Sequence, residues 1–390
     1  MKAKKLMYVS AALALTALGA QAQSTPGSGL TYSNGSSAVT VYGLIDVTLV
    51  NKNNVNTAGQ SLTAPQVAWF SGNRWGITGS YGEGGPDDIK TIFRLEGEFE
   101  SETGSFDTNN VIFNRDSWVG LQSKSLGKLT IGRQNALGRD PAGSASYGDP
   151  YGGAKASTEE GGYTNNNNFK QLIFYAGSAN GTRVNNGVVW KKEWDSGFVS
   201  GLMYSFGTVP DSFNTGSSTT ASLAYNGSGY TVAGFATSAN INNFGHKTIS
   251  FGGNMQLNSL VRVNAGYFYY TAQQAGVLGD RQDNAWTLST KLTPEGKFHY
   301  EVGYQVMRAS NAGVNGSGFV QNAYSDTSAL TATGTGSRNT LYGSIFYNLN
   351  RQTELYVAFD RLNTTDTYLA AQANGATSAN EYGVGMRFKF

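Results

Sequence analysis

The chain has 390 residues, of which 51 are glycine, 22 tyrosine, 20 phenylalanine and six tryptophan, and only 14% are charged. Such a composition excludes a disordered chain, and the absence of cysteine excludes a disulfide-stapled module. The formal charge of +2 includes three lysines close to the first residue, and without them 25 basic residues face 26 acidic ones. No basic stripe for a nucleic acid remains, so we expect no nucleic-acid partner.

Residues 1–22 have the pattern of a secretory signal peptide. Lys2, Lys4 and Lys5 precede an apolar stretch that begins at Leu6 and ends in the triplet Ala-Gln-Ala, residues 20–22. This pattern predicts cleavage before Gln23. The apolar stretch is too short and too rich in alanine for a stable membrane helix, and the chain is therefore expected to leave the cytoplasm.

Residues 23–37, QSTPGSGLTYSNGSS, are small and polar and show no hydrophobic periodicity. We interpret them as a flexible leader. The folded part is then expected to span residues 38–390.

From Ala38 onward the hydrophobic pattern has a period of two. No apolar run approaches the roughly 20 residues that a spanning helix needs. In the last ten residues, EYGVGMRFKF, alternation places Tyr382, Val384, Met386, Phe388 and Phe390 on one face. Glycines and charged residues occupy the other face, so the segment is predicted to be a strand with one apolar and one polar side.

Sixteen segments share this alternation. An even number of about ten-residue strands, joined alternately by short turns and long polar loops, is typical of a closed antiparallel membrane barrel. The segments span residues 38–50, 67–80, 88–100, 111–123, 127–135, 183–192, 198–206, 219–226, 230–239, 247–257, 260–270, 284–292, 298–309, 337–348, 353–363 and 381–390.

A soluble β-sandwich, propeller or solenoid would also permit alternation. The polar face, however, carries charges and glycines that a packed sandwich core would not accept, and aromatic residues gather near the segment ends on the apolar face, as in interfacial girdles. In lipid the sheet must close, because an open edge would leave backbone groups unpaired. We therefore expect a 16-stranded transmembrane β-barrel of the all-β class.

Several phrases carry a resemblance to a known family. They include VTVYGLIDVTLV (39–50), NRWGITGSYG (73–82), RDSWVGLQSKSLGKLTIGRQ (115–134) and the final YGVGMRFKF. On these phrases the chain resembles the general diffusion porins of Gram-negative outer membranes, most closely the betaproteobacterial type, over essentially all of residues 38–390. The terminal phenylalanine with alternating aromatics also looks like the signal by which porins are inserted.

The resemblance implies a trimer in the outer membrane, in contact with lipid and lipopolysaccharide, that passes ions and small hydrophilic solutes. It further implies a long third loop folded into the lumen to form a constriction. Residues 135–182 are the candidate for this loop, and their motif GDPYGG (148–153) is similar to the tip of such loops. By that similarity Asp149 would face the pore. The segment QLIFYAG (171–177) departs from the pattern and could belong to an extra hairpin or to the sixth strand.

Opposite this loop, porins of this kind set a cluster of arginines on the barrel wall. Local motifs carry this role to Arg74, Arg115 and Arg183, with Glu96 as an acidic partner. Alternation independently puts Arg74 on the polar face of its strand. Trp118 has the opposite parity to Arg115 and is expected to face lipid or a neighbour, whereas the apolar Val119 and Leu121 share the parity of Arg115. A local bulge would resolve this conflict. An excess of positive charge at the constriction predicts a mild preference for anions.

Three other functions remain as alternatives. A substrate-specific channel would need an aromatic track on the polar face, where Tyr356 and Phe268 look isolated. A barrel enzyme would need a nucleophile beside a histidine, but His246 is expected in a loop and His299 on a polar face near Glu301, with no G-x-S-x-G motif. An adhesin would have fewer strands. No cysteine or histidine spacing predicts a metal or cofactor, and we expect none.

Overall fold

The structure is a computed structural model, and it describes residues 29–67, 69–82, 88–139, 175–178, 182–314, 320–371 and 374–390. The expected signal peptide, the tip of the expected constriction loop and Asp149 lie outside these residues. Within the described part, no helix is both long and apolar enough to cross a membrane.

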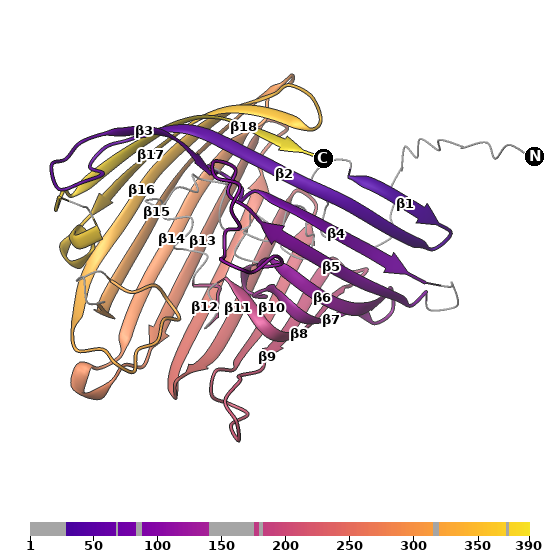
Figure 1. Ribbon diagram of the computed structural model, residues 1–390, viewed down its shortest axis with the longest axis horizontal. Coiled ribbons are helices and arrows are strands. Elements are labelled where there is room, and N and C mark those ends of the chain that lie inside the picture. The colour runs from indigo at the N-terminus through magenta and orange to yellow at the C-terminus, as the bar shows by residue number, and fades with distance from the viewer. Residues whose placement is uncertain are drawn as a thin grey trace, which may run out of the picture.

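The described residues form eighteen strands in one antiparallel sheet (Figure 1). Their bounds are β1 (Leu30–Asn34), β2 (Ser37–Lys52), β3 (Leu62–Val67), β4 (Arg74–Tyr81), β5 (Lys90–Glu98), β6 (Asp116–Ser123), β7 (Gly127–Asn135), β8 (Arg183–Glu193), β9 (Phe198–Ser205), β10 (Ser218–Gly227), β11 (Tyr230–Ile241), β12 (Phe244–Gln256), β13 (Val261–Ala272), β14 (Arg281–Leu292), β15 (Phe298–Gly313), β16 (Thr333–Asn348), β17 (Thr353–Thr364) and β18 (Ser378–Lys389). Two short 3-10 helices, η3 (Gly276–Leu278) and η4 (Asp366–Ala371), lie in connections.

These strands occupy sixteen positions around a closed ring. Strands β3 and β4 pair with the two halves of β2, so together they fill one position. Strand β1 pairs with the first residues of β2, beyond the point where β18 stops pairing with β2. Pairing of β18 with β2 closes the ring, and the expected 16-stranded barrel is confirmed.

The predicted strand 67–80 was wrong in one respect, because the chain leaves the sheet between β3 and β4. There the backbone N–H groups of Phe70 and Ser71 donate to the carboxylate of Asp46, at 3.1 and 3.0 Å, and that of Trp69 donates to Thr48 Oγ1. Asp46 and Thr48 are inner-face residues of β2. The segment is therefore drawn into the barrel, and Trp69 is almost completely buried.

The expected flexible leader also differs from the structure, because its residues Leu30–Asn34 form β1. The two residues Gly35 and Ser36 connect β1 to β2, and Gly35 has a φ of 61°. A glycine with positive φ at the first central position is what a tight hairpin turn with the native twist requires. Turn chemistry thus overrides the lack of hydrophobic periodicity.

Connections at the two rims differ in length, as expected. One rim has short turns at residues 124–126, 194–197, 228–229, 257–260, 293–297 and 349–352, and the other rim has long connections that include residues 99–115, 136–182, 206–217, 314–332 and 365–377. One connection at the second rim is short: Asn242 and Asn243, with φ of 49° and 70°, join β11 to β12. Asparagine adopts this left-handed conformation more easily than other non-glycine residues.

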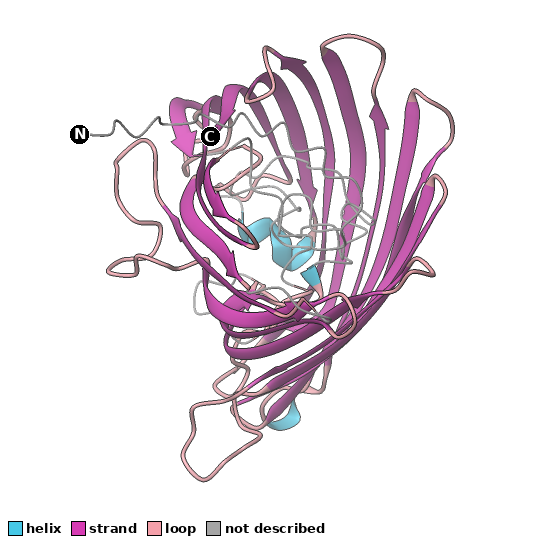
Figure 2. Cartoon of the chain, turned by 90° about the vertical axis from the view of Figure 1, so that its right-hand side faces the viewer, coloured by secondary structure: helices cyan, strands magenta, loops and turns pink. Residues whose placement is uncertain are grey.

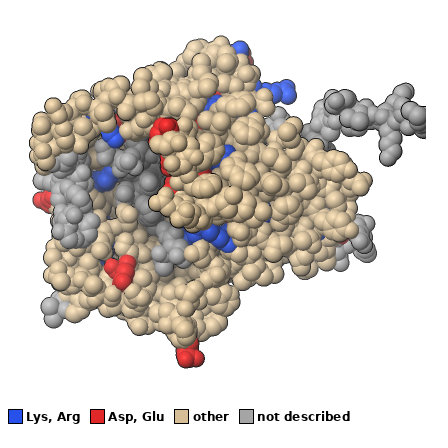
Figure 3. Space-filling view, viewed as in Figure 1, with Lys and Arg blue, Asp and Glu red and all other residues tan. Residues whose placement is uncertain are grey.

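Inner and outer faces differ sharply in chemistry. Outward residues of β12 and β18 such as Phe251 and Val384 are 63% and 61% exposed. Among the described residues, seventeen charged side chains are buried, fifteen on strands and two, Arg115 and Arg139, in connections, whereas long stretches of the outer surface carry no charged side chain (Figure 3). An apolar outside and a charged inside are what a barrel in lipid requires.

Candidate functional site

A cluster of buried charges lies on the inner wall formed by β4, β5 and β6. On β5, alternation puts Arg94, Glu96 and Glu98 on the inner face. The register sets Arg74 of β4 opposite Glu98 and Asp116 of β6 opposite Glu96. Arg74 and Glu98 are therefore opposite charges that stabilise the pairing of β4 and β5, whereas Glu96 and Asp116 are like charges across β5 and β6. Arg94, whose Nε lies 3.7 Å from Asp116 Oδ2, offsets their repulsion.

Glu96 is the centre of this cluster. Its carboxylate lies 4.0 Å from Arg74 Nη1 and 3.3 Å from Arg94 Nη2, and it accepts a hydrogen bond from Arg115 Nε. The hydroxyl of Tyr42 donates to Glu96 Oε2 at 2.6 Å. Arg115 Nη1 also pairs with Glu98. The structure thus brings together three of the predicted residues, Arg74, Arg115 and Glu96.

Arg115 reaches the inner face without the expected bulge. It precedes β6, which begins at Asp116, and the adjacent residues Asn114 and Arg115 are both buried, so strand alternation does not apply to them. The prediction that Trp118 faces lipid was wrong. Trp118 lies on the inner face, where the Lys128 ammonium is 5.9 Å from its ring. Strand β6 begins at Asp116, five residues after the predicted start at residue 111, and its register sets Trp118 opposite the inward Arg94 of β5.

Arg183 begins β8 and lies at the edge of the same cluster. It is within electrostatic range of Arg115, Arg139, Glu98 and Asp116. Its Nε is buried without a hydrogen-bond partner in the structure. The loop expected at 135–182 begins and ends as its motifs indicated, since β7 ends at Asn135 and β8 begins at Arg183.

Sequence reasoning missed a second set of basic residues, which lie closer than the arginines to the rim with the short turns. Lys90, Gln122, Lys128 and Lys191 are successive cross-strand partners on β5 to β8. Lys128 and Lys191 are 6% and 7% exposed. The short turn 124–126 fixes the register that sets Gln122 opposite Lys128, so this part of the row could have been found from the turn.

The two sides of the lumen carry different charge. Among the described residues, the wall of β4 to β8 holds six buried basic and three buried acidic side chains: Arg74, Arg94, Arg115, Lys128, Arg139 and Lys191 against Glu96, Glu98 and Asp116. The wall of β14 to β18 and β2 holds three basic and five acidic ones: Arg281, Arg338 and Arg387 against Asp46, Asp283, Glu301, Asp360 and Glu381. The lumen is therefore polarised from one wall to the other.

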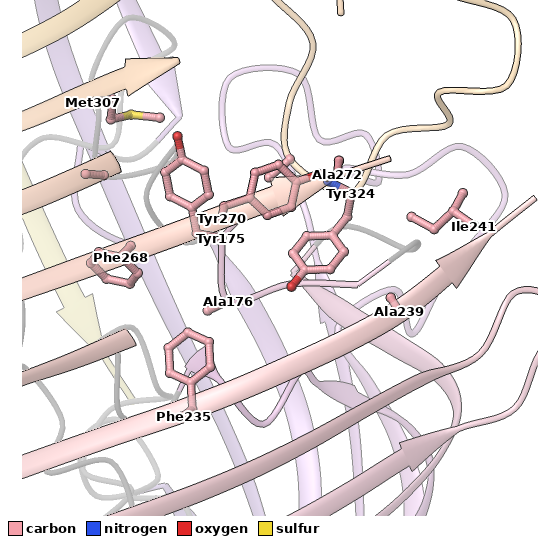
Figure 4. Packing of buried hydrophobic residues seen from close by; sticks show 12 residues of the cluster. Tyr175, Ala176, Phe235, Ala239, Ile241, Phe268, Tyr270, Ala272, Met307 and Tyr324 are labelled. Carbon is pink, nitrogen blue, oxygen red and sulfur yellow. Dashed lines mark hydrogen bonds between the residues drawn. The ribbon is translucent and has the colours of Figure 1, made fainter. Parts of the chain in front are cut away.

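Loop segments fold into the lumen and cover parts of its wall (Figure 2). Tyr175, which lies in no strand, packs against Phe268 and Tyr270 of β13. Residue Tyr324, from the connection of β15 to β16, packs on the same wall (Figure 4). The inward turn after β3 places Phe70 4.9 Å from Phe346 and 4.8 Å from Tyr356, between ring centroids.

These contacts correct two expectations. Phe268 and Tyr356 are not isolated, because each belongs to an aromatic cluster covered by an inward segment. Residues 175–177 lie outside every strand, so they are not part of β8. Sequence alternation identifies which face a residue occupies but not which distant segment covers it.

One of the two histidines differs from expectation. His246 lies in β12 rather than in a loop, fully buried, with Nδ1 2.7 Å from the hydroxyl of Tyr270. His299 lies on the inner face of β15, as predicted; its ring stacks on Phe346, and its Nε2 lies 3.9 Å from Oε2 of Glu354. Within the described ranges, no group of three or more metal-ligating side chains is gathered.

A closed ring of sixteen antiparallel strands, apolar outside and charged inside, defines the class of membrane-spanning β-barrels with a polar lumen. The model of the Gram-negative porin family matches residues 9–367, and the chain belongs to this family. Its location is the outer membrane.

Two kinds of relative support this assignment. An outer membrane porin protein of Bordetella pertussis is 28% identical over 216 residues, which are 52% of this chain and 48% of the relative. The match thus spans about half the length of that relative. Among solved structures, an anion-selective porin from Comamonas acidovorans has a TM-score of 0.68 at 20% identity, over 91% of this chain and 100% of its own. OmpF of Salmonella typhi has a TM-score of 0.58 at 13% identity, over 93% and 100%. At such identities these structures establish the fold.

Proposed function

We propose that this protein is a passive diffusion channel for ions and small hydrophilic solutes, with a mild preference for anions. The observation that carries the proposal is the buried basic wall of β4 to β8, which faces a lumen whose other wall is predominantly acidic. Its constriction would be formed by Arg74, Arg115, Arg183 and Glu96, with Asp149 on the loop opposite. A porin from Comamonas acidovorans with the same fold is described as anion-selective, which supports the direction of the preference.

The mechanism rests on the electrostatics of a water-filled passage. A field directed from a basic to an acidic wall orders water and eases the passage of polar solutes over apolar ones. One unit charge about 5 Å from a permeating ion contributes roughly 0.8 kcal/mol at the dielectric of water and about 3 kcal/mol at an effective dielectric of 20. Salt screens these energies further, so the preference is several-fold and not absolute.

The acidic side chains limit this preference. Glu96, Glu98 and Asp116 lie among the arginines on the same wall, where they compensate part of the positive charge. Buried guanidinium groups need such partners, because an uncompensated charge away from water is costly. The positive charge that remains in excess on this wall comes from Lys128, Arg139 and Lys191 as well as from the predicted arginines.

We further propose that the channel works as a homotrimer in contact with lipid and lipopolysaccharide. The outer faces of β2 to β6 carry exposed apolar side chains such as Leu49, Val119 and Leu121, which would suit either lipid or a neighbouring copy. One solved neighbour, OmpT of Vibrio cholerae, is described in a trimer form. An enzymatic role finds no support in the surroundings of His246 and His299, which are aromatic rings, a tyrosine hydroxyl and one carboxylate.

A test uses the refolded protein in planar bilayers and in liposomes. We expect stepwise conductance in groups of three, and swelling rates that decline smoothly as neutral sugars become larger. Saturable uptake of one sugar would point to a substrate-specific channel instead. A folded barrel without conductance would refute the proposal and favour an enzyme or an adhesin.

A further inference from the structure

Two inward segments from different loops converge on one ion pair of the inner wall. Asp283 of β14 is fully buried and is held by Arg281, whose Nε and Nη2 donate to its two oxygens at 2.9 and 2.6 Å. The hydroxyl of Tyr175, from the connection of β7 to β8, donates to Asp283 Oδ2 at 2.7 Å. From the connection of β15 to β16, the carbonyl of Gln321 accepts from Arg281 Nη1 at 2.7 Å.

The second segment is fixed along its length as well. Tyr324 is 3% exposed; its backbone N–H donates to the hydroxyl of Tyr270 at 2.9 Å, and its own hydroxyl is 2.8 Å from Thr248 Oγ1. Three residues later, Thr327 donates to the carbonyl of Gln273. These contacts hold Tyr324 against the inner faces of β12 and β13 and fix Thr327 just after the end of β13. Residues 321–327 therefore lie against the inner wall at this end of the barrel.

The two segments also touch a common aromatic surface. Tyr175 lies 5.6 Å from Tyr270, and Tyr324 lies 5.3 Å from the same ring, between centroids. Both segments therefore contact the ring of Tyr270 (Figure 4). Both also bond to the Arg281 and Asp283 pair, through Tyr175 and Gln321. Displacing either segment would uncover Tyr270. It would also remove one hydrogen-bond partner from the buried Arg281 and Asp283 pair, which costs free energy.

We propose that residues 321–327 are a second constriction element, and that Arg281 and Asp283 couple it to the Tyr175 segment so that both together set the solute size limit. This inference rests on the proposed diffusion function and names residues on the wall opposite the arginine cluster. Arg281 and Asp283 are positioning residues here. Size selection would thus lie on β12 to β14 and charge selection on β4 to β8.

The experiment compares Tyr175→Phe, Tyr324→Phe, the double variant and Asp283→Asn with the wild type in liposomes, using neutral sugars of rising size. Phenylalanine keeps the ring packing and removes only the hydroxyl. Loss of a hydrogen bond to a charged group shifts a docking equilibrium by roughly tenfold or more. We expect the largest sugars to enter at least about twofold faster in Tyr175→Phe and in Asp283→Asn, with a smaller rise in Tyr324→Phe. Tyr304→Phe, on the outer face of β15, is the control.

Coupling is tested by the double variant. A shared anchor predicts that its effect is smaller than the product of the two single effects, because releasing one segment already loosens the other. Independent, multiplicative effects or an unchanged size limit would overturn the proposal. The ratio of anion to cation permeability is expected to stay at the wild-type value in the tyrosine variants, which change no charge, and to rise in Asp283→Asn, which removes a carboxylate beside Arg281. An absence of conductance in the refolded wild type would instead reject the proposed function itself. If Asp283→Asn does not fold, the tyrosine variants alone decide the question.

Discussion

The charged side chains of the lumen are held by one another rather than by water alone. Glu96 interacts with three arginines and Tyr42, and it is 3% exposed. Because its negative charge offsets three guanidinium groups, Glu96 contributes to folding as well as to the field in the pore. The best-matched acidic partner predicted from the sequence is thus structurally the centre of the cluster.

Replacing Glu96 by glutamine is expected to destabilise the barrel. Removing one partner of a buried ionic group costs about 3–5 kcal/mol, because the remaining charges are left uncompensated. The midpoint of heat unfolding, followed by the mobility of the folded barrel on gels, measures this. Lys247→Gln, an exposed outer-face change on β12, is the control. Equal midpoints for the two variants would contradict the central role of Glu96.

Alkaline pH should weaken the packing of η4. Burial, followed by the charge of Asp283, raises the pKa of Tyr368 to about 12. Its phenol is protonated in both folded and unfolded chains below pH 10, so its contribution to the free energy of unfolding is complete there and is lost as the pH rises from about 10 to 12. Tyr368→Phe should therefore flatten the fall in stability across that interval. The free energy of unfolding is measured with urea at several pH values from 10 to 12. An equally steep fall with pH in Tyr368→Phe and in the wild type would contradict this prediction.

Among the structural elements, glycines opposite aromatic rings shape the inner wall. Tyr356 of β17 pairs with Gly385 of β18, and a Cβ at Gly385 would lie 2.2 Å from the ring. The ring therefore lies flat across the glycine, and its hydroxyl can reach Asp46, to which it donates at 2.5 Å. Asp46 in turn holds the inward turn that carries Phe70.

Gly385→Val should displace Tyr356 and release this turn. We expect a loss of at least about 2 kcal/mol in the free energy of unfolding, in the range of overpacked cores. Gly343→Ala is the matched control, because the nearest atom to its Cβ would be 3.5 Å away, an ordinary contact. Denaturant unfolding of both variants gives the comparison. If Gly385→Val were as stable as Gly343→Ala, this would count against the proposed packing of Tyr356.

How far the sequence predicts these elements depends on the range of the interactions. Alternation and turn chemistry are local, so all sixteen ring positions and the bounds of the loop after Asn135 could be found. The break at Trp69 depends on Asp46, which is distant in sequence, and the inward path of Tyr324 depends on Tyr270 and Thr248. Such contacts leave no periodic pattern. For the same reason local motifs point to Arg74, Arg115 and Glu96 but not to Arg281 and Asp283.

At the scale of the whole molecule, the two walls of the lumen carry opposite net charge. The wall of β4 to β8 carries the positive excess, and the wall of β14 to β18 and β2 carries the negative one. A nearly neutral chain can therefore have a strongly polarised lumen, which its net charge does not reveal. We expect ion preference to follow the charge at the narrowest section and not the total charge.

The most direct test of this account is the reversal potential of the refolded protein in a planar bilayer under a gradient of potassium chloride. We predict a potential that corresponds to several-fold higher permeability for chloride than for potassium, and a decrease of that ratio in Arg74→Gln but not in Lys247→Gln. A potential that favours potassium in the wild type would contradict the proposed anion preference. An unchanged ratio in Arg74→Gln would exclude this arginine from the constriction.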